Sequence, residues 1–438
     1  MKHLTVDFNR ITGPIKPVNG VNNGPLTANF AQDARPYFKE AGIPFSRLHD
    51  TEYPFGSGEF VDVDCIFKVF ACDENDPDNY NFTLTDEYFK AIDECGTKII
   101  YRLGATIEHQ PVKVHVHPPK DYLKWARICE HIILHYNEGW ANGMHLGIEY
   151  WEIWNEPELT SHTCWTGTPE EFCNFYRVVV GYLKGKFPHL KFGGPACCTA
   201  RQEFPRQFLQ AISQGERAPL DFFSWHGYEN DPKLAIESAR QIDELLKEFG
   251  YDQAESINDE WNYVRDWSQI RQAHEVISSR RGAAFTAAMM CALQHSCCDI
   301  ATYYDAQVKM AATWNGMFAP TKQPVHGQAG IVELKKGYYP FKAFAELRRL
   351  GQEAYSEIED GNIYVCAASG DGHAVMLANF HDTECKSERV KVTLNGAENV
   401  KMKVLRLCGT KNLDQVGEIT DGGTITMLPY SVVLLTDR

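Results

Sequence analysis

The feature that most constrains the fold of this chain is a regular alternation of strand-like and helix-like segments between about residues 18 and 345. Such an alternation is typical of βα units, in which parallel strands are connected by helices. The helix-like segments include 120–136, 169–186 and 339–350, and the last of them ends at Gly351, a natural stop. We expect the strands at eight positions: 19–24, 46–50, 99–104, 150–155, 191–196, 221–228, 254–262 and 300–305. Eight such units predict an α/β fold with a (β/α)8 TIM barrel over residues 18–350.

After Gly351 the pattern changes to short β-rich runs. Turn signals separate them, for example at 370–372, 395–396 and 421–423. The runs lie at 363–368, 373–380, 388–394, 400–407 and 424–436. They predict a C-terminal antiparallel β-sandwich, to which residues 4–9 are expected to add a strand. The predicted accessory domain therefore comprises residues 1–17 plus 351–438.

Two glutamates follow predicted barrel strands. Glu156 ends the aromatic run 150–157, and Glu260 lies in a similar run, 104 residues further on, which is three βα units of about 35 residues. The carboxyl ends of barrel strands meet at one face, where such folds place their chemistry. Hydrolysis of a glycosidic bond requires one protonated and one ionised carboxyl group, so Glu156 and Glu260 are the candidate catalytic pair. Neighbouring strand residues point to opposite faces, so we expect Asp259 to be structural.

The barrel region resembles retaining glycoside hydrolases, and within them glycoside hydrolase family 39. The most specific element is Trp154-Asn155-Glu156-Pro157, and the segments 193–196 and 226–228 narrow the resemblance to the family. Further segments that carry it are 46–49, 118–125, 152–159, 191–196, 221–228, 260–262 and 336–344. The resemblance implies a barrel with an accessory β-sandwich and no cofactor. It also implies that Glu156 is the general acid/base and Glu260 the nucleophile.

The resemblance implies a set of substrate-binding residues as well. Asn155 is expected to bind the sugar 2-hydroxyl and His49 a ring hydroxyl, while His226 is expected between the glutamates, with Tyr228 close by. The run 301–307 departs from the family's β-xylosidases, because Tyr304 stands where they have a tryptophan and Asp305 adds a carboxylate. Trp261, next to Glu260, is either a core residue or a sugar-stacking platform. The same alternatives hold for four further indoles: Trp151, Trp154, Trp225 and Trp314.

The function implied by the resemblance is a retaining exo-glycosidase that releases a terminal sugar from plant-derived oligosaccharides or glycosides. β-Xylosidase is the leading activity, and β-galactosidase and α-L-arabinopyranosidase are the alternatives. A rival of another class is a non-catalytic carbohydrate-binding barrel, although such a protein would not need both glutamates. An iduronidase is disfavoured because its acidic substrate calls for a basic pocket. Arg102 is expected to form a buried pair within the barrel rather than to meet an anionic sugar.

Charge and cysteine content limit the partners and the location. The net charge of −15 and the lack of a basic run argue against nucleic acid and anionic membranes as partners. No stretch is apolar enough for a transmembrane helix, and the N-terminal residues lack a signal-peptide core. The 14 cysteines lie largely in apolar runs without a disulfide-scaffold spacing, so we expect a reduced, cytoplasmic protein. His109, His115 and His117 could suggest a metal site, but we expect no metal. The oligomeric state is not predicted.

Overall fold

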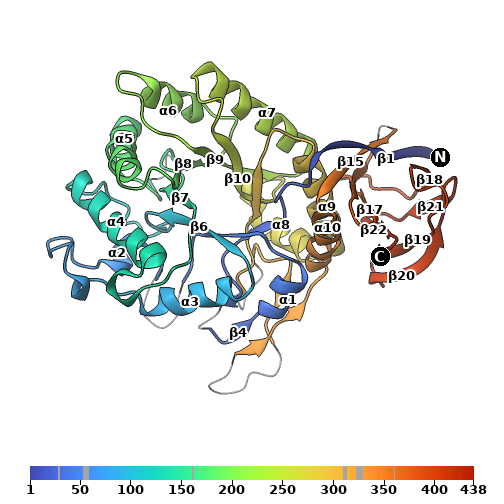
Figure 1. Ribbon diagram of the computed structural model, residues 1–438, viewed down its shortest axis with the longest axis horizontal. Helices are drawn as coiled ribbons and strands as arrows, with labels where there is room; N and C mark the ends of the chain where they lie inside the picture. The colour runs from blue at the N-terminus through green and yellow to red at the C-terminus, as the bar shows by residue number, and fades with distance from the viewer. Residues whose placement is uncertain (28–29, 53–58, 160–161, 309–312, 322–328, 360) are drawn as a thin grey trace.

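The computed structural model describes residues 1–27, 30–52, 59–159, 162–308, 313–321, 329–359 and 361–438. A closed barrel of eight parallel strands, surrounded by helices, forms the larger part of the molecule (Figure 1). In chain order the barrel strands are β2 (Gly20–Asn22), β5 (Phe45–Leu48), β6 (Lys98–Leu103), β7 (Tyr150–Ile153), β8 (Lys191–Cys197), β9 (Phe222–Glu229), β10 (Glu255–Tyr263) and β11 (Ile300–Tyr303). Each coincides with one of the eight predicted strands, and β11 pairs with β2 to close the ring. The predicted TIM barrel is confirmed.

Helices surround the barrel and follow its strands along the chain. They are α1 (Arg35–Glu40), α2 (Val63–Ile66), α3 (Thr83–Asp93), α4 (Tyr122–Glu138), α5 (Pro169–Lys186), α6 (Phe204–Ser213), α7 (Pro232–Glu248), α8 (Ile270–Ile277), α9 (Arg280–Gln294) and α10 (Tyr338–Leu350). Local sequence explains several ends. The Asp121 carboxylate accepts a hydrogen bond from the backbone N–H of Lys124 and begins α4, and Thr168 forms a capping box with Glu171 at α5. Gly351, with φ of 85°, ends α10.

Short elements lie in the connections between the barrel strands. β3 (Leu26–Thr27), β4 (Gln32–Asp33) and β13 (Gly330–Ile331) form a small sheet, and β12 (Phe318–Ala319) pairs with β14 (Glu333–Leu334). Three single turns of 3₁₀-helix are η1 (Pro77–Asn79), η2 (Trp140–Asn142) and η3 (Trp267–Gln269). The third of these turns, η3, follows the carboxyl end of β10.

Nine strands form a second sheet. They are β1 (Lys2–Pro14), β15 (Gln352–Ile358), β16 (Ile363–Ser369), β17 (His373–Asn379), β18 (Glu388–Asn395), β19 (Met402–Leu407), β20 (Asn412–Ile419), β21 (Thr424–Met427) and β22 (Ser431–Thr436). The order is β20-β19-β22-β17-β16-β15-β1-β18-β21, and neighbours are antiparallel except β1 and β18. Strands from both ends of this order share one apolar core, which contains Val390, Met402 and Val433. The sheet therefore folds over on itself.

The sequence prediction differs from this sheet in three places. The single run expected at 424–436 is two strands, because Pro429 cannot donate to a sheet and Tyr430 has a positive φ of 52°. β15 and β20 were not predicted. β20 is mostly exposed and polar, so it lacks the apolar alternation by which a strand is recognised.

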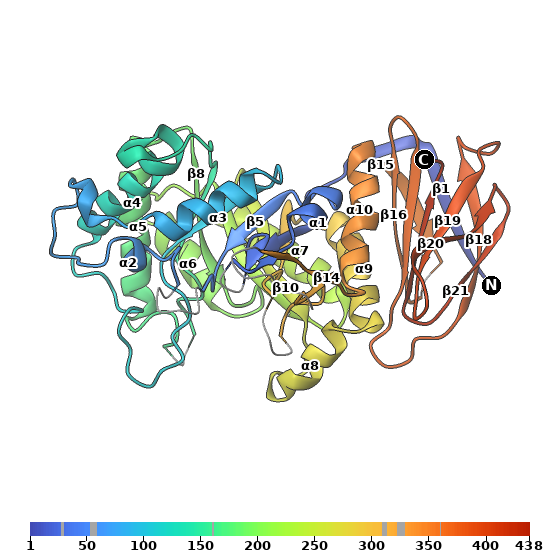
Figure 2. The same cartoon turned by 90° about the horizontal axis from the view of Figure 1, so that it is seen from below.

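The sheet packs on the barrel through two helices. Figure 2 shows α9 and α10 between the barrel and the second sheet, whose strand β16 lies beside them. Both helices are in contact with β16 and β17. Met376, Phe380 and Leu434 of the sheet belong to the same apolar core as the barrel. The division into domains 18–350 and 1–17 plus 351–438 remains our proposal. Among the described residues no helix is both long and apolar enough to cross a membrane.

Candidate active site

Polar side chains from several barrel strands converge on one cleft at the carboxyl ends of the strands. Asp50 follows β5, Glu156 follows β7, and Tyr304 follows β11, while Tyr228 and Glu260 lie near the ends of β9 and β10. All five line the same cleft of about 810 Å³. The two glutamates singled out by sequence therefore face one cavity large enough for sugar rings.

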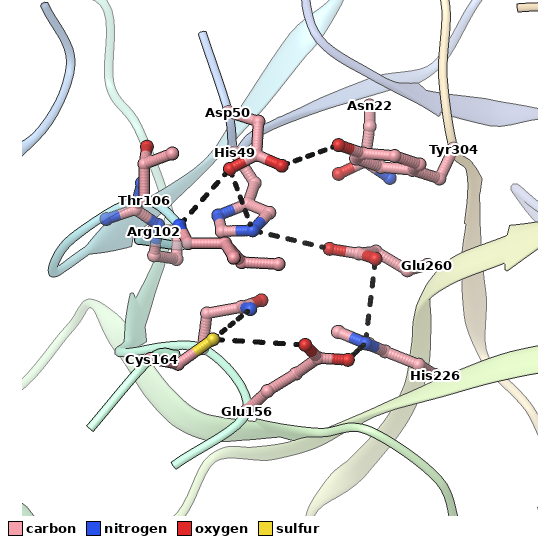
Figure 3. Close-up of polar contacts among 12 residues, drawn as sticks. Asn22, His49, Asp50, Arg102, Thr106, Glu156, Cys164, His226, Glu260 and Tyr304 are labelled. Carbon is pink, nitrogen blue, oxygen red and sulfur yellow. Dashed lines mark hydrogen bonds and ion pairs between the residues drawn. The ribbon is translucent and has the colours of Figure 1, made fainter. Parts of the chain in front are cut away.

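Glu156 lies in a left-handed turn directly after β7, with φ of 42°. Its carboxyl oxygen Oε1 is 2.8 Å from Nδ1 of His226, and Oε2 is 3.9 Å from the thiol of Cys164 (Figure 3). Burial raises the pKa of the Glu156 carboxyl from 4.5 to about 8, and the negative charge of Asp50 adds to this shift. Burial also lowers the pKa of His226 to about 4. At neutral pH, Glu156 thus carries a proton beside a neutral imidazole.

Glu260 is held by two donors on β5 and β9. Arg47 Nη1 donates to Oε1 at 2.7 Å, and the Tyr228 hydroxyl donates to Oε2 at 2.6 Å. Burial raises the pKa of the Glu260 carboxyl above its usual 4.5, whereas His226, Arg47 and the hydrogen bond from Tyr228 oppose that rise. The carboxylate is therefore fixed in orientation and its ionised form is supported by charge and hydrogen bonds.

His226 links the two glutamates. Its Nδ1 lies 2.8 Å from Oε1 of Glu156 and 3.6 Å from Oε2 of Glu260 (Figure 3). Both distances are measured from the same nitrogen, so Oε1 of Glu156 and Oε2 of Glu260 cannot be farther apart than the sum of these two distances. The predicted position of His226 between the glutamates is thus the one observed.

Arg47 is the centre of the network beneath Glu260, and the sequence analysis did not single it out. Nη2 donates to the Asn155 amide oxygen at 2.8 Å, and Nε lies 2.7 Å from Glu152 and 2.9 Å from Asp259. The guanidinium is fully buried, and a buried charge requires such partners. The available signal was a charged residue inside the short barrel strand β5, all four residues of which are buried.

Asp259 does not point away from Glu260, contrary to the argument from strand alternation. The pairing of β10 with β9 shifts between Asn258 and Glu260, so Asp259 is the extra residue of a β-bulge. Both Asp259 and Glu260 consequently reach Arg47. Burial and the nearby charge of Glu152 raise the pKa of Asp259 well above its usual value, whereas the charge of Arg47 opposes this rise.

The raised pKa of Asp259 favours its protonated form. Replacing Asp259 with asparagine is therefore expected to change the free energy of unfolding by less than about 1 kcal/mol, because the amide is isosteric with the carboxyl group and keeps an acceptor for Arg47. Asp259→Ala removes that acceptor and is expected to cost about 1–3 kcal/mol. Chemical denaturation of both variants measures the difference. Equal destabilisation by the two substitutions would mean that Asp259 is ionised in the folded protein.

The other predicted binding residues are divided between the cleft and the core. His49 is buried, with Nε2 3.3 Å from Asp50 and 3.9 Å from Glu260, and Asn155 lies between Arg47 and the Cys164 thiol, which is 3.9 Å from its amide nitrogen. Both lie beside the cleft glutamates.

Two predicted binding residues lie elsewhere. Trp261 is fully buried in the barrel core against Tyr303, because its side chain alternates away from that of Glu260. Asp305 is 2% exposed and is not among the described residues that line the cleft. The cleft indoles are instead Trp314 and Trp267, which is 59% exposed on η3. Sequence reasoning missed Trp267 because it lies beyond the strand end.

The predicted buried pairing of Arg102 is confirmed, since its Nη2 lies 2.5 Å from Asp62. Asp62, Asp64 and His115 place ligand atoms within 4.8 Å of one another. Asp62 also accepts a hydrogen bond from the backbone N–H of Thr106 at 2.7 Å. An adjacent guanidinium repels a cation, so this cluster is poorly suited to hold a metal.

Comparisons with known proteins agree with this geometry. A β-xylosidase from Geobacillus stearothermophilus is 30% identical over 190 residues, which are 40% of this chain and 36% of that relative, so the match spans well under half of its length. A glucosidase from Croceicoccus marinus has a similar structure, with a TM-score of 0.78 at 17% identity, covering 100% of this chain and 98% of the other. A monomeric β-xylosidase from Caulobacter crescentus has a TM-score of 0.71 at 16% identity, with 100% and 99% covered.

The family assignment follows from a match to most of the chain. The model of glycosyl hydrolases family 39 matches residues 60–419, a range that includes both cleft glutamates and most of the second sheet. This protein therefore belongs to glycosyl hydrolases family 39.

Proposed function

We propose that this protein is a retaining exo-glycosidase that releases a terminal sugar from plant-derived oligosaccharides or glycosides. The observation that carries the proposal is the convergence of Glu156 and Glu260 on one cleft, with His226 in contact with both. Their protonation supports two different roles. Glu156 is protonated at neutral pH, and Glu260 accepts hydrogen bonds from Arg47 and Tyr228 that stabilise its anion. Glycoside hydrolysis requires such a pair of one protonated and one ionised carboxyl group.

In the first step the Glu260 carboxylate attacks the anomeric carbon while the bond to the leaving oxygen breaks. Glu156 transfers its proton to that oxygen, so the aglycone leaves as a neutral alcohol and the sugar remains as an ester on Glu260. Arg47 and Tyr228 hold the attacking carboxylate in orientation. If His226 Nδ1 donates to Oε1, the proton of Glu156 resides on Oε2.

In the second step water attacks the anomeric carbon, and Glu156, now ionised, removes a proton from it. The ester bond to Glu260 breaks, the sugar leaves with its original configuration, and both glutamates regain their starting protonation. Esterification removes the negative charge of Glu260, which otherwise favours protonation of its neighbour. Loss of that charge allows Glu156 to act as a base.

The spacing of the glutamates supports retention over inversion. Retaining enzymes place the carboxyl groups about 5–5.5 Å apart, whereas inverting enzymes leave about 6.5–9.5 Å for a water molecule. The His226 contacts of 2.8 and 3.6 Å require Oε1 of Glu156 and Oε2 of Glu260 to lie closer together than most of the inverting range, which supports retention. A direct test is proton NMR of the first-formed anomer.

The leading activity is that of a β-xylosidase, which the family assignment and the xylosidase relative favour. β-Galactosidase and α-L-arabinopyranosidase activities are the alternatives, favoured by Tyr304 at the eighth strand end. A panel of 4-nitrophenyl glycosides tests these activities with wild-type protein. Turnover of none of them would favour the non-catalytic carbohydrate-binding barrel, whose sugar affinity isothermal titration calorimetry would then measure.

The pH dependence of kcat/KM is expected to report both glutamates. Glu156 must be protonated, so activity should fall about tenfold per pH unit above about pH 8, where its carboxyl loses the proton. Glu260 must be ionised, so activity should also fall on the acidic side, at a pH above the 4.5 of an ordinary glutamate. Initial rates on an aryl glycoside between pH 4 and 10 measure both limbs. A constant rate across pH 8 would contradict the acid role of Glu156.

We also propose a reducing, cytoplasmic site of action. All 14 cysteines are free thiols, and burial raises the pKa of many of them, including Cys164 beside Glu156. A secreted chain of this cysteine content would ordinarily carry disulfides. Thiol titration of the protein isolated without reductant tests this point.

A further inference from the structure

The cleft contains a third carboxylate, Asp50, that the proposed reaction does not use. We propose that Asp50, held by Tyr304, binds hydroxyl groups of a neutral sugar in the cleft and excludes uronic acids. This inference rests on the proposed function and narrows its substrate class. It assigns to Asp50 the role that the sequence analysis expected of Asp305.

The position of Asp50 is tightly defined. Its Oδ2 accepts a hydrogen bond from the Tyr304 hydroxyl at 2.7 Å, and its Oδ1 lies 3.4 Å from the backbone nitrogen of Ile107 and 3.3 Å from His49 Nε2. These contacts join the ends of β5 and β11 across the cleft. Figure 3 shows Asp50 and Tyr304 on one side of Glu260, with Glu156 and His226 on the other. A sugar whose anomeric carbon meets Glu260 would thus extend its other hydroxyls toward Asp50.

Asp50 is also placed as a binding group rather than as a structural one. Its side chain is 20% exposed and lines the cleft, although most of its surface is covered. Its backbone has φ of 53°, a conformation that costs free energy for a residue other than glycine and recurs at functional sites. The partly exposed carboxylate retains lone pairs that can accept hydrogen bonds from two neighbouring sugar hydroxyls.

The charge around the cleft supports exclusion of an anionic sugar. Of the described residues that line it, Arg201 is the one permanent cation, and it forms an ion pair with Glu229. Asp50 and Glu260 add negative charge, and the nearby Arg102 is paired with Asp62 outside the cleft lining. Among the described lining residues, a uronic carboxylate would therefore meet like charge without a free cation to pair with, an arrangement that selects against it.

Two sets of 4-nitrophenyl glycosides isolate this preference. β-Xylosides, β-glucosides and β-glucuronides share a ring configuration and differ only in the C5 substituent, which is hydrogen, hydroxymethyl or carboxylate. α-L-Arabinopyranosides, β-galactosides and β-galacturonides form the matching second series. In the series that the wild-type protein cleaves, we expect the neutral members to be preferred. Where the uronide is not turned over, its inhibition constant against a neutral substrate takes the place of kcat/KM.

Asp50→Asn is expected to lower kcat/KM on the preferred neutral glycoside by about tenfold to a hundredfold, the usual effect of losing a hydrogen bond to a charged group. Its preference for neutral over uronic sugar should shrink by at least about tenfold, because the repelling charge is removed. Tyr304→Phe removes the donor that positions Asp50 and should lower kcat/KM on the neutral glycoside less than Asp50→Asn. It keeps the charge of Asp50, so the preference for neutral over uronic sugar should remain. Asp252→Asn, outside the cleft, is the matched control and should match wild type.

An active, folded Asp50→Asn protein that keeps the wild-type sugar preference would overturn this inference alone, and so would a wild-type preference for the uronide. If the wild-type protein cleaves neither series, the proposed function fails and this inference fails with it. The melting temperature of each variant distinguishes a specific effect from misfolding. The three outcomes are therefore separable in one experiment.

Discussion

Glu260→Ala is expected to reduce kcat on aryl glycosides by about 10⁴-fold or more, because it removes the carboxylate that we propose attacks the anomeric carbon. Burial raises the pKa of Glu156 to about 8, so this second cleft glutamate is protonated at neutral pH and cannot replace the Glu260 anion. The loss should be similar for good and poor leaving groups, since attack is removed in both cases. Steady-state rates on a series of substituted phenyl glycosides measure it.

Added azide sharpens this test. An azide ion can occupy the space of the missing carboxylate in Glu260→Ala and attack the anomeric carbon directly, which gives a glycosyl azide of inverted configuration. Glu255→Gln, at the start of the same strand, is the matched control. Its carboxylate binds Lys191 and lies outside the cleft, so activity should be unchanged. Near-normal turnover by Glu260→Ala would assign the nucleophile to another residue.

The fold was predictable where the sequence alternates in a simple way. Each barrel strand is a short, largely buried run that alternates with helical segments along the chain, so even the limits of 191–196 were close to those of β8. The second sheet was harder, because strand β20 pairs through its backbone while its side chains face solvent. Backbone hydrogen bonds leave no trace in the amino-acid pattern when neither face of a strand is buried.

The sequence predicted those site residues that lie in recognisable motifs at the ends of barrel strands. Glu156 and Glu260 were identified because a pair of carboxyl groups at barrel strand ends suits glycoside hydrolysis, and because the residues around them resemble the family. The environment of Glu260 was not predictable, since Arg47 makes five contacts that only the closed barrel brings together. In addition, the bulge at Asp259 reverses the side-chain direction that strand alternation predicts. Likewise, nothing in the run 301–307 indicates that Tyr304 reaches Asp50 on the second barrel strand.

Glu156→Ala is expected to have an effect that depends on the leaving group. With a poor leaving group such as an alkyl alcohol, kcat/KM should fall by about 10²–10⁴-fold, the usual contribution of a general acid. With 2,4-dinitrophenol, which departs without a proton, kcat/KM should remain close to that of the wild-type protein. The second step then limits kcat, because no base activates the water. A glycosyl-enzyme ester on Glu260 should therefore accumulate and be visible by mass spectrometry.

Azide and pH complete the assignment of Glu156. Azide needs no general base, so it should restore turnover of the 2,4-dinitrophenyl glycoside and yield a glycosyl azide of retained configuration, the opposite of the Glu260→Ala product. The decline in kcat/KM above about pH 8 should also disappear, because the group that loses its proton there is absent. Glu149→Gln, at the other end of the strand that precedes Glu156, should keep the decline. An equal loss of activity for every leaving group, without azide rescue, would show that Glu156 supports the fold of the cleft rather than proton transfer.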